Sequence, residues 1–241
     1  MSEFELEKNS QEQLDANTYN KVKLISYSKY VSDKNNPTDN LESMVAYCAR
    51  VSNPSNQATS SELSNSKLIG YLIKNNHWSP FEMVSVCLEI NTTRDIARQI
   101  LRHRSFSFQE FSQRYALADL GHEIREARLQ DKKNRQNSLE TNDVELIEQW
   151  AAIQREIHEQ TTNAYKWAIS NGIAKEQARV ILPEGNTLSR LYVNGTLRSW
   201  IHYIQLRTGN GTQKEHRDIA YQCAKSIEPI FPMIMDFVSL I

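Results

Sequence analysis

The segment VSVCLEI, which begins at Val84, limits the possible folds more than any other part of this sequence. Its large apolar side chains stand at every second position: Val84, Val86, Leu88 and Ile90. Because successive side chains of a strand point to opposite faces, this alternation predicts a strand with one buried face. Helical spacing follows directly in IARQILRH, and Thr92, with Asp95 three residues later, is a candidate N-cap.

Apolar spacing indicates helix in most of the remaining chain. We expect helices from near Leu41, around residues 68–73, from about Asp143, in AKEQARVIL before Pro183, in TLRSWIHYIQLR, and from near Thr212 with a bend or break at Pro229 or Pro232. Strands are expected in VKLISYSKY and LSRLYV, with a turn at Asn194–Gly195. The strands are separated by whole helices, and hairpin signals are few.

The length of 241 residues fits one large domain or two small ones. Hydrophobic residues make up 39% of the chain and charged residues 24%, which argues against general disorder. We treat residues 1–241 as a single domain. Within it, residues 1–20 are polar and are expected to be loose, and residues 120–142 carry almost no large apolar side chains. The second segment is therefore expected to be a solvated loop or insertion.

The cysteines Cys48, Cys87 and Cys223 are widely spaced and form no CxxC pair, which argues against a disulfide framework or a cysteine-rich zinc site. The histidines are not in metal-ligand spacing either. The first residues, MSEFELEKNSQEQ, are polar and acidic, unlike a secretory signal. No run approaches the roughly 20 apolar residues of a membrane helix. We expect a soluble cytoplasmic protein with no metal and no membrane partner.

Five arginines and no lysine lie between residues 94 and 114: Arg94, Arg98, Arg102, Arg104 and Arg114. The guanidinium group presents a rigid fork of donors that matches phosphate and carboxylate groups. Only Asp95 and Glu110 oppose this charge within the segment, and burial of unpaired arginines would be costly. One interpretation is an exposed basic helix face with surface salt bridges, and the other is a site for an anionic ligand.

Beyond Arg104 the pattern changes to a period of two, which would place Glu110, Ser112 and Arg114 on one side of an extended chain. The phenylalanines of this stretch are Phe106, Phe108 and Phe111. Together with the arginines, they could form a stacking platform for single-stranded nucleic acid over residues 94–115. The formal net charge of −1 argues against such a binding module.

Three further blocks hold candidate polar groups: NHWSPFE with His77, Ser79 and Glu82, EQARVILP with Arg179, and TLRSWIHYIQLR with Arg198, His202 and Arg207. Each block alone is also typical of an ordinary turn or helix surface. No GxGxxG follows a strand, and the motifs GxxxxGK[ST], HExxH and GxSxG are absent. The sequence therefore does not indicate a common nucleotide-binding loop, a zinc protease or a serine hydrolase.

Arg102-His103-Arg104, followed by seven residues and then Ser112, resembles the RHR-x7-S signature of the flavin-dependent thymidylate synthases. The flanking sequence ARQILRHRSFSFQEFSQRY and the blocks HWSPFE, ARVILP and RSWIHYIQLR are similar to that family in order and spacing. The similarity extends from about Leu41 to Ala224. Four ordered blocks are much harder to obtain by chance than one short motif.

The resemblance implies an α+β fold, with a largely antiparallel central sheet flanked by long helices. It also implies a homotetramer whose active sites lie at subunit interfaces, so that FAD is held without a Rossmann motif. The implied reaction is the reductive methylation of dUMP to dTMP, with methylenetetrahydrofolate as carbon donor, bound FAD as hydride carrier and NADPH as reductant. A flavin-binding scaffold without catalysis is the alternative, against which the complete set of arginines argues.

By position, the resemblance implies contacts with dUMP from Gln99, Arg102, Glu110, Ser112, Arg114, Arg179 and Arg207. It implies contacts with FAD from Ser52, His77, Ser79, Arg102, His103, Arg104, Ser105, Glu110, Arg198 and His202. Arg207 matches the arginine held against the pyrimidine, and is the expected catalytic residue because it can stabilise negative charge as N3 loses its proton. Ser112 is expected to bind rather than attack, since no base is positioned to activate it, and no cysteine is expected to act as a nucleophile.

Overall fold

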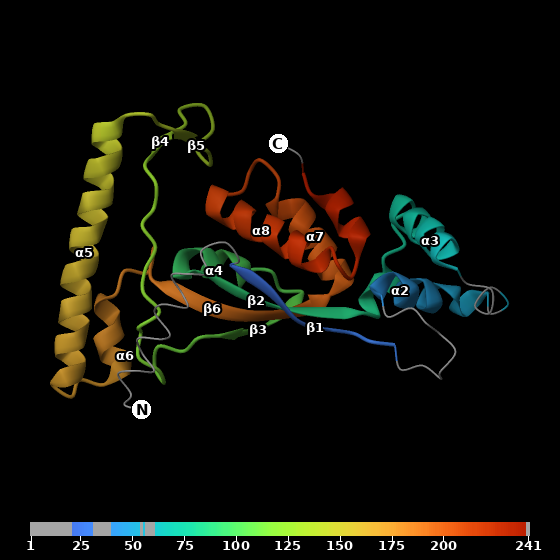
Figure 1. Cartoon of the computed structure of the whole chain (residues 1–241), viewed down its shortest axis with the longest axis horizontal. Helices are drawn as coiled ribbons and strands as arrows, with labels where there is room; N and C mark the ends of the chain where they lie inside the picture. The colour runs from blue at the N-terminus through green and yellow to red at the C-terminus, as the bar shows by residue number, and fades with distance from the viewer. Residues whose placement is uncertain (1–20, 31–39, 54, 56–60, 240–241) are drawn as a thin grey trace.

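Two nine-residue strands, β2 and β6, pair along their whole length at the centre of the molecule (Figure 1). The strands of this sheet are β1 (Val22–Tyr27), β2 (Ser85–Thr93), β3 (Phe106–Glu110) and β6 (Leu188–Thr196). β1 pairs with β2 and β3 pairs with β6, which gives the order β1-β2-β6-β3 with every pairing antiparallel. The antiparallel sheet that the family resemblance implies is therefore confirmed.

The computed structural model describes residues 21–30, 40–53, 55 and 61–239. The segment 1–20, which the sequence predicts to be loose, lies outside these residues. Within the described ranges, no helix combines the length and the apolar character needed to cross a membrane. The same part of the chain contains no group of three or more His, Cys, Asp or Glu side chains placed to hold a metal ion.

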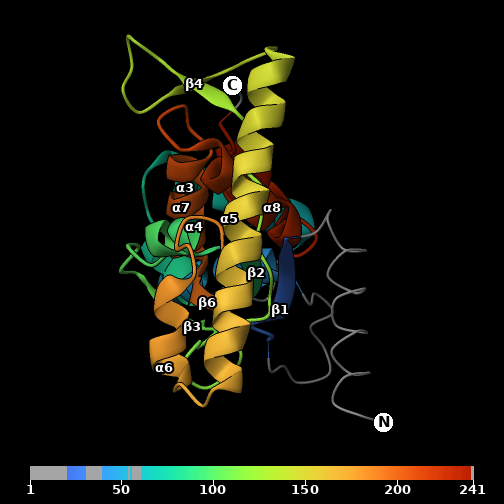
Figure 2. The ribbon, with the colours of Figure 1, turned by 90° about the vertical axis from the view of Figure 1, so that its left-hand side faces the viewer.

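Helices cover one face of the sheet and extend past both of its ends (Figure 1). They are α2 (Leu41–Ala49), α3 (Glu62–Lys74), α4 (Arg94–Ile100), α5 (Val144–Ser170), α6 (Lys175–Ala178), α7 (Leu197–Arg207) and α8 (Lys214–Ile227). Short 3-10 helices include η1 (Arg50–Ser52), η3 (Ser79–Glu82), η4 (Arg179–Ile181) and η5 (Pro232–Phe237). α4, α7 and α8 lie over the sheet, α2 and α3 lie at one end, and α5 lies at the other end with α6 beside it (Figure 2). The helices expected from apolar spacing are all present.

The alternation that predicts β2 is confirmed by its burial. Val86, Leu88 and Ile90 have no exposed surface, whereas the residues between them are partly exposed. The buried face packs against α7 and α8 in one continuous core. Nε1 of Trp200 in α7 donates a 3.0 Å hydrogen bond to the backbone oxygen of Val86. The indole therefore fixes α7 directly onto the central strand.

The predicted turn at Asn194–Gly195 is wrong. Both residues lie inside β6, where Gly195 is opposite Val86 of β2 and Phe106 of β3. The glycine provides space rather than a turn, because a Cβ atom at this position would lie 2.3 Å from Cδ1 of Phe106. The ring of Phe106 packs on the strand backbone and reaches Trp200, with ring centroids 4.7 Å apart.

The predicted N-cap Thr92 is also wrong, by one residue. β2 continues to Thr93, whose extended backbone (φ −78°, ψ 157°) occupies the N-cap position of α4. The Thr93 hydroxyl does not cap the helix and hydrogen-bonds to Asp95 instead. The carboxylate of Asp95 accepts a hydrogen bond from the backbone nitrogen of Ile96 (2.8 Å). Both threonines are buried and β-branched, so the strand continues through them.

Segment 120–142 is more regular than the sequence indicates. It contains the hairpin of β4 (Arg128–Gln130) and β5 (Ser138–Glu140). Nε2 of Gln130 donates to backbone oxygen atoms across the hairpin loop, and Asp131 accepts from the backbone nitrogens of Lys133 (2.8 Å) and Asn134 (3.1 Å). Because these contacts are polar, the shortage of large apolar side chains gives no indication of them.

The close packing at Gly195 leads to a prediction about stability. Gly195→Ala must displace the ring of Phe106, and overpacking of this kind lowers the free energy of unfolding by about 1–3 kcal/mol. Gly70→Ala is the matched control, because this residue lies within α3 and no atom is within 4 Å of an added Cβ. Loss of a helical glycine stabilises by about 0.5–1 kcal/mol. Urea unfolding followed by circular dichroism, at one protein concentration, measures both variants.

We expect a lower denaturation midpoint for Gly195→Ala and an equal or higher one for Gly70→Ala. Combining Phe106→Leu with Gly195→Ala should recover part of the loss, since the smaller side chain leaves room for the new methyl group. Equal midpoints for Gly195→Ala and the unchanged protein would contradict the packing described above.

Candidate functional site

The residues Arg102–Ser105 form the turn that joins α4 to β3. α4 ends at Ile100, and the backbone nitrogen of His103 donates to the Ile100 oxygen at 3.0 Å. This reversal leaves His103 half-buried and the other three side chains of the turn exposed. No described carboxylate is within ion-pairing distance of Arg102 or Arg104. Their guanidinium groups are therefore available to a ligand.

His103 points toward the C-terminal end of α7, where it meets Arg207. Nε of Arg207 donates to Nε2 of His103 at 2.9 Å. Burial, and then the charge of Arg207, lowers the pKa of His103 to about 4, so the ring is neutral at physiological pH and carries its proton on Nδ1. Arg207 also lacks a carboxylate partner among the described residues. We name Arg102, His103, Arg104 and Arg207 the central patch.

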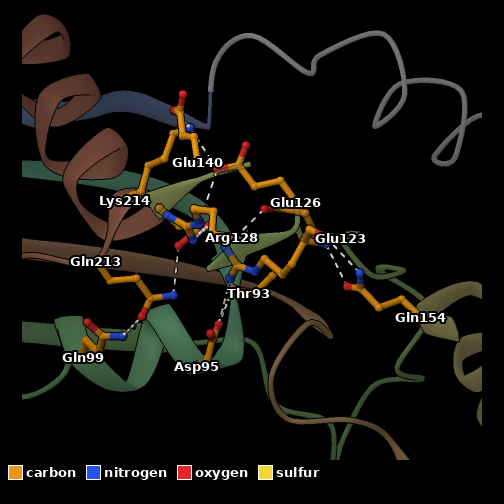
Figure 3. A network of polar contacts seen from close by, with 12 residues as sticks. Thr93, Asp95, Gln99, Glu123, Glu126, Arg128, Glu140, Gln154, Gln213 and Lys214 are labelled. Carbon is orange, nitrogen blue, oxygen red and sulfur yellow. Dashed lines mark hydrogen bonds and ion pairs between the residues drawn. The ribbon is translucent and has the colours of Figure 1, made fainter. Parts of the chain in front are cut away.

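A line of hydrogen-bonded side chains, which we name the polar chain, lies beside the central patch. Nδ1 of His216 lies 3.1 Å from Oε1 of Gln99, and Nε2 of His216 lies 3.2 Å from the hydroxyl of Tyr203. Nε2 of Gln99 donates to Oε1 of Gln213 at 2.8 Å, and Nε2 of Gln213 donates to Glu215 at 2.9 Å (Figure 3). The polar chain joins α4, α7 and α8.

Glu215 is the charged end of the polar chain. Arg128 hydrogen-bonds to its carboxylate, and Nη1 of Arg125 lies 3.4 Å from the same oxygen. Burial alone would raise the pKa of Glu215, but hydrogen bonds from Arg128 and Gln213, together with the charge of Arg125, lower it to about 2. Arg125 also ion-pairs with Asp95 at 3.0 Å, at the start of α4, and Figure 3 shows Asp95 and Arg128 in this network. Glu215 is therefore an anion throughout the physiological pH range.

The two arginines of α4, Arg94 and Arg98, are paired within the chain. Arg98 binds Glu110 through both Nη atoms, at 3.1 and 3.2 Å. Arg94 and Arg98 also bind Glu184, at 2.7 and 3.1 Å. Surface salt bridges thus account for this part of the arginine-rich segment, as one interpretation expects. They do not account for the central patch.

The expectation that Glu110, Ser112 and Arg114 share one side of an extended chain is wrong. β3 ends at Glu110, and Ser112 begins a turn. Arg114 extends toward α6, where its Nε lies 3.4 Å from the carboxylate of Glu176. The period of two continues in the sequence past the last residue that pairs with β6, which is why the pattern overestimates the strand. Ser112 and Arg114 therefore lie toward the α5–α6 end, with Arg179, which directly follows α6.

Five of the predicted FAD contacts lie at the α2–α3 end of the molecule: Ser52, His77, Ser79, Arg198 and His202. η3 contacts both α2 and α7 there. Arg198, at the start of α7, pairs with Glu82 of η3. His202, one turn later, faces the ring of Trp78, with centroids 5.1 Å apart.

On one chain, the predicted ligand contacts are therefore spread along the molecule. Arg179 directly follows α6, and Ser52 ends the 3-10 helix that follows α2. α6 and α2 lie at opposite ends of the longest axis of the molecule, with α4 and α7 between them (Figure 1). The structure brings the central patch and Gln99 together. Arg198 and His202 lie on α7, the helix that ends at Arg207, and Oγ of Ser199 donates to the backbone oxygen of Ser105 at 3.3 Å. Ser52 and Arg179, at the two ends of the molecule, are not brought to this group.

Sequence reasoning missed the arginine partners of Glu215 and most of the polar chain. Arg125 and Arg128 lie in the segment 120–142, whose composition indicates only a solvated loop. Two arginines three residues apart in this segment were nevertheless a usable signal of a contact with a carboxylate. His216 meets Gln99 across a sequence separation of 117 residues. A cavity of about 360 Å³ opens between Arg125, Arg128 and α5, and none of the predicted ligand contacts lines it.

The three phenylalanines do not form an exposed stacking platform. Phe106 is 9% exposed and packs edge-on against Trp200 and Tyr203, and Phe108 and Phe111 are half-buried. An aromatic surface that binds single-stranded nucleic acid needs accessible ring faces. The packing of Phe106 therefore counts against the nucleic-acid interpretation of residues 94–115.

Comparison with known proteins supports the family resemblance directly. Residues 35–233 match the family described as "Thymidylate synthase complementing protein". A probable flavin-dependent thymidylate synthase of Paramecium bursaria Chlorella virus 1 is 48% identical over 213 residues, which cover 88% of this chain and 96% of the viral protein. The flavin-dependent thymidylate synthase of Synechocystis sp. is 50% identical over 193 residues, which cover 80% of this chain and 87% of that protein.

Solved structures are similar over nearly the whole chain. The crystal structure of the UMP/dUMP methylase PolB from Streptomyces cacaoi, bound with 5-Br dUMP, has a TM-score of 0.72 and 25% sequence identity. The similarity covers 90% of this chain and 93% of that one. With the RHR-x7-S motif on the turn between α4 and β3, and with close relatives of the same description, this chain belongs to the flavin-dependent thymidylate synthase family.

Proposed function

We propose that this protein converts dUMP to dTMP by reductive methylation, with methylenetetrahydrofolate as carbon donor and NADPH as reductant. The observation that carries the proposal is the central patch. It holds three guanidinium groups without a described carboxylate partner, one of which, that of Arg207, hydrogen-bonds to a neutral histidine. Arginines in this state are suited to bind the phosphate of a nucleotide. A solved neighbour of this fold is a UMP/dUMP methylase bound with 5-Br dUMP, a ligand of the proposed class.

FAD is the proposed cofactor, and the residues at its expected contacts suit its polar groups. Arg102 and Arg104 are exposed and unpaired among the described residues, so both can bind a pyrophosphate. Ser105 presents an exposed hydroxyl in the same turn, and His202 presents an exposed ring beside Trp78. When bound, FAD supplies hydride-transfer chemistry.

Arg207 is the proposed catalytic residue. Its Nε is occupied by His103, so its two Nη groups remain available to the pyrimidine. A guanidinium group held there stabilises negative charge as N3 loses its proton, and this makes C5 a better carbon nucleophile. Because His103 is neutral, it orients Arg207 without adding charge beside it.

The proposed reaction uses no covalent enzyme nucleophile. Burial raises the pKa of all three cysteine thiols, of which Cys223 is fully buried. A thiol with a raised pKa is a poor source of thiolate at neutral pH. No described residue hydrogen-bonds to the hydroxyl of Ser112, so that serine lacks an activating base. Binding of dUMP is therefore the proposed role of Ser112.

The proposed active site is shared between copies of the chain in a homotetramer. Arg114 and Arg179 lie at one end of the molecule and Ser52 at the other, with the central patch between them. Residues so far apart can contact one set of ligands only if different copies contribute them. α5 also carries partly exposed apolar side chains that a second copy could cover: Ile147, Trp150, Ile153 and Ile157.

The first prediction about function concerns Arg207. Arg207→Lys keeps the positive charge but loses the planar fork, and we expect kcat/KM for dUMP to fall by about 10²-fold, as on removal of one preorganised donor. Arg190→Lys is the matched control, because Arg190 pairs with Glu89 and belongs to no predicted contact. The measurement is dTMP formation with NADPH and methylenetetrahydrofolate, in protein whose flavin absorbance equals that of wild type. No dUMP-dependent turnover by flavin-loaded wild type would refute the proposed function.

The shared site can be tested by mixing inactive variants. Arg207→Gln removes a group of the central patch, and Arg179→Gln removes one near α6. Refolding the two variants together should restore up to about one quarter of wild-type activity, because that fraction of sites receives both intact arginines from different chains.

A mixture of Arg207→Gln with Arg102→Gln is the control for this experiment. Both residues lie in the central patch, so every site that lacks one substitution carries the other, and no recovery is expected. Recovery in neither mixture, with oligomers formed in both, would show that Arg179 and Arg207 serve the same copy.

A third prediction concerns the cysteines. The triple substitution of Cys48, Cys87 and Cys223 by alanine should leave turnover within about threefold of wild type, since none has the lowered pKa of a nucleophilic thiol. Turnover and flavin content are compared in the same preparation. Inactivity of a folded, flavin-bound triple variant would mean that a thiol takes part in the reaction.

A further inference from the structure

Gln99 is a proposed dUMP contact whose amide can face its neighbours in only one way. The reason begins at Glu215, which is ionised because Arg128 and Arg125 lower its pKa. A carboxylate only accepts hydrogen bonds, so the contact of 2.9 Å between Glu215 and Gln213 requires the NH₂ group of Gln213. The carbonyl Oε1 of Gln213 then faces Gln99.

Gln213 fixes the next groups of the polar chain in the same way. Because Oε1 of Gln213 only accepts, Gln99 must present its NH₂ group across the contact of 2.8 Å. Oε1 of Gln99 then faces Nδ1 of His216 at 3.1 Å, and this nitrogen must carry the proton. Nε2 of His216 is left as an acceptor for the hydroxyl of Tyr203, 3.2 Å away.

Burial makes this polarity strict. His216 has no exposed surface and Tyr203 is 2% exposed, so water does not compete for their hydrogen bonds. Burial, and then the charge of Arg207, lowers the pKa of His216 to about 3, so the ring has a single N–H. Turning the Gln99 amide over would set two donors or two acceptors face to face at both of its contacts.

We infer that His216 is a positioning residue for nucleotide binding: its Nδ1–H holds the carbonyl of Gln99, and the amide keeps one uncommitted N–H with which Gln99 donates to an acceptor oxygen of dUMP. This inference rests on the proposed function and adds to it the residue that fixes the polarity of one dUMP contact. His216 itself touches no proposed ligand position. Its effect on binding passes through Gln99.

Two substitutions of His216 distinguish the roles of its two ring nitrogens. Asparagine can place an amide N–H close to the position of Nδ1, and so can keep the bond to Gln99. Glutamine reaches toward the position of Nε2 and the Tyr203 hydroxyl, and so loses that bond. The measurement is the dissociation constant of dUMP, by titration calorimetry on flavin-loaded protein. We expect about tenfold weaker binding for His216→Gln, and binding within about twofold of wild type for His216→Asn.

His158→Gln is the matched control. His158 is also buried, on α5, where it stacks on His122 with ring centroids 3.5 Å apart and lies outside the polar chain. Its substitution should leave the dissociation constant unchanged. Gln213→Leu is a second variant at a half-buried position, and it cuts the polar chain between Glu215 and Gln99. We expect about threefold weaker dUMP binding, and this variant decides the question if His216→Gln fails to hold flavin.

Each outcome bears on the inference. Wild-type affinity in both His216→Gln and Gln213→Leu would overturn it, and so would equal weakening by glutamine and asparagine at position 216, because packing rather than the Nδ1 donor would then be responsible. Failure of the flavin-loaded wild type to bind dUMP at all would instead overturn the proposed function, and the inference with it.

Discussion

The pairing of β2 with β6 determines where the chemically important side chains meet. Each strand continues directly into a helix, β2 into α4 and β6 into α7, and because the strands are antiparallel these helices begin at opposite ends of the pair. The 7 residues of α4 and the 11 of α7 span together about 27 Å, and the nine-residue strands span about 30 Å. Both helices fold back over the sheet (Figure 1), so their C-terminal ends converge. The contact of His103 with Arg207 lies at this convergence.

The same geometry explains how the central patch keeps its positive charge. Arg207 lies in the last turn of α7, and Arg102 follows the end of α4 by two residues. Unpaired carbonyl groups give a helix C-terminus a partial negative charge, which favours a cation there. Arg94 begins α4 and Arg98 lies in its last turn, and carboxylates of Glu110 and Glu184 pair with both. The reach of the Glu110 and Glu184 carboxylates therefore separates the arginines that are paired internally from those left for a ligand.

Local patterns predict most of this fold, and long-range polar contacts account for most of what they miss. The alternation from Val84 identifies β2, and apolar spacing locates the helices, because both depend on neighbours in the sequence. Gly195 was misinterpreted because the side chain that requires a glycine there, the ring of Phe106, lies on another strand. Arg102, His103 and Arg104 were identified through the RHR-x7-S motif, and Arg207 through the block RSWIHYIQLR. His216 could not be identified, since nothing near it in the sequence indicates that it faces Gln99. The distance between predicted ligand contacts such as Arg179 and Ser52 likewise depends on the fold and could not be predicted from the sequence.

The charged group around Glu215 is better explained by orientation than by stability. Arg125 and Arg128 are largely buried, with side chains 15% and 13% exposed, and they face Asp95, Glu123 and Glu215. The free energy needed to remove so many charges from water offsets most of the Coulombic attraction between them. Buried ion pairs therefore stabilise a fold little compared with apolar residues of the same size. Apolar side chains at the same positions, however, would leave Gln213 free to turn over. An anion fixed at one end of a line of neutral side chains gives every amide and ring in that line a single orientation. In the middle of the line this orientation fixes Gln99, beside the central patch.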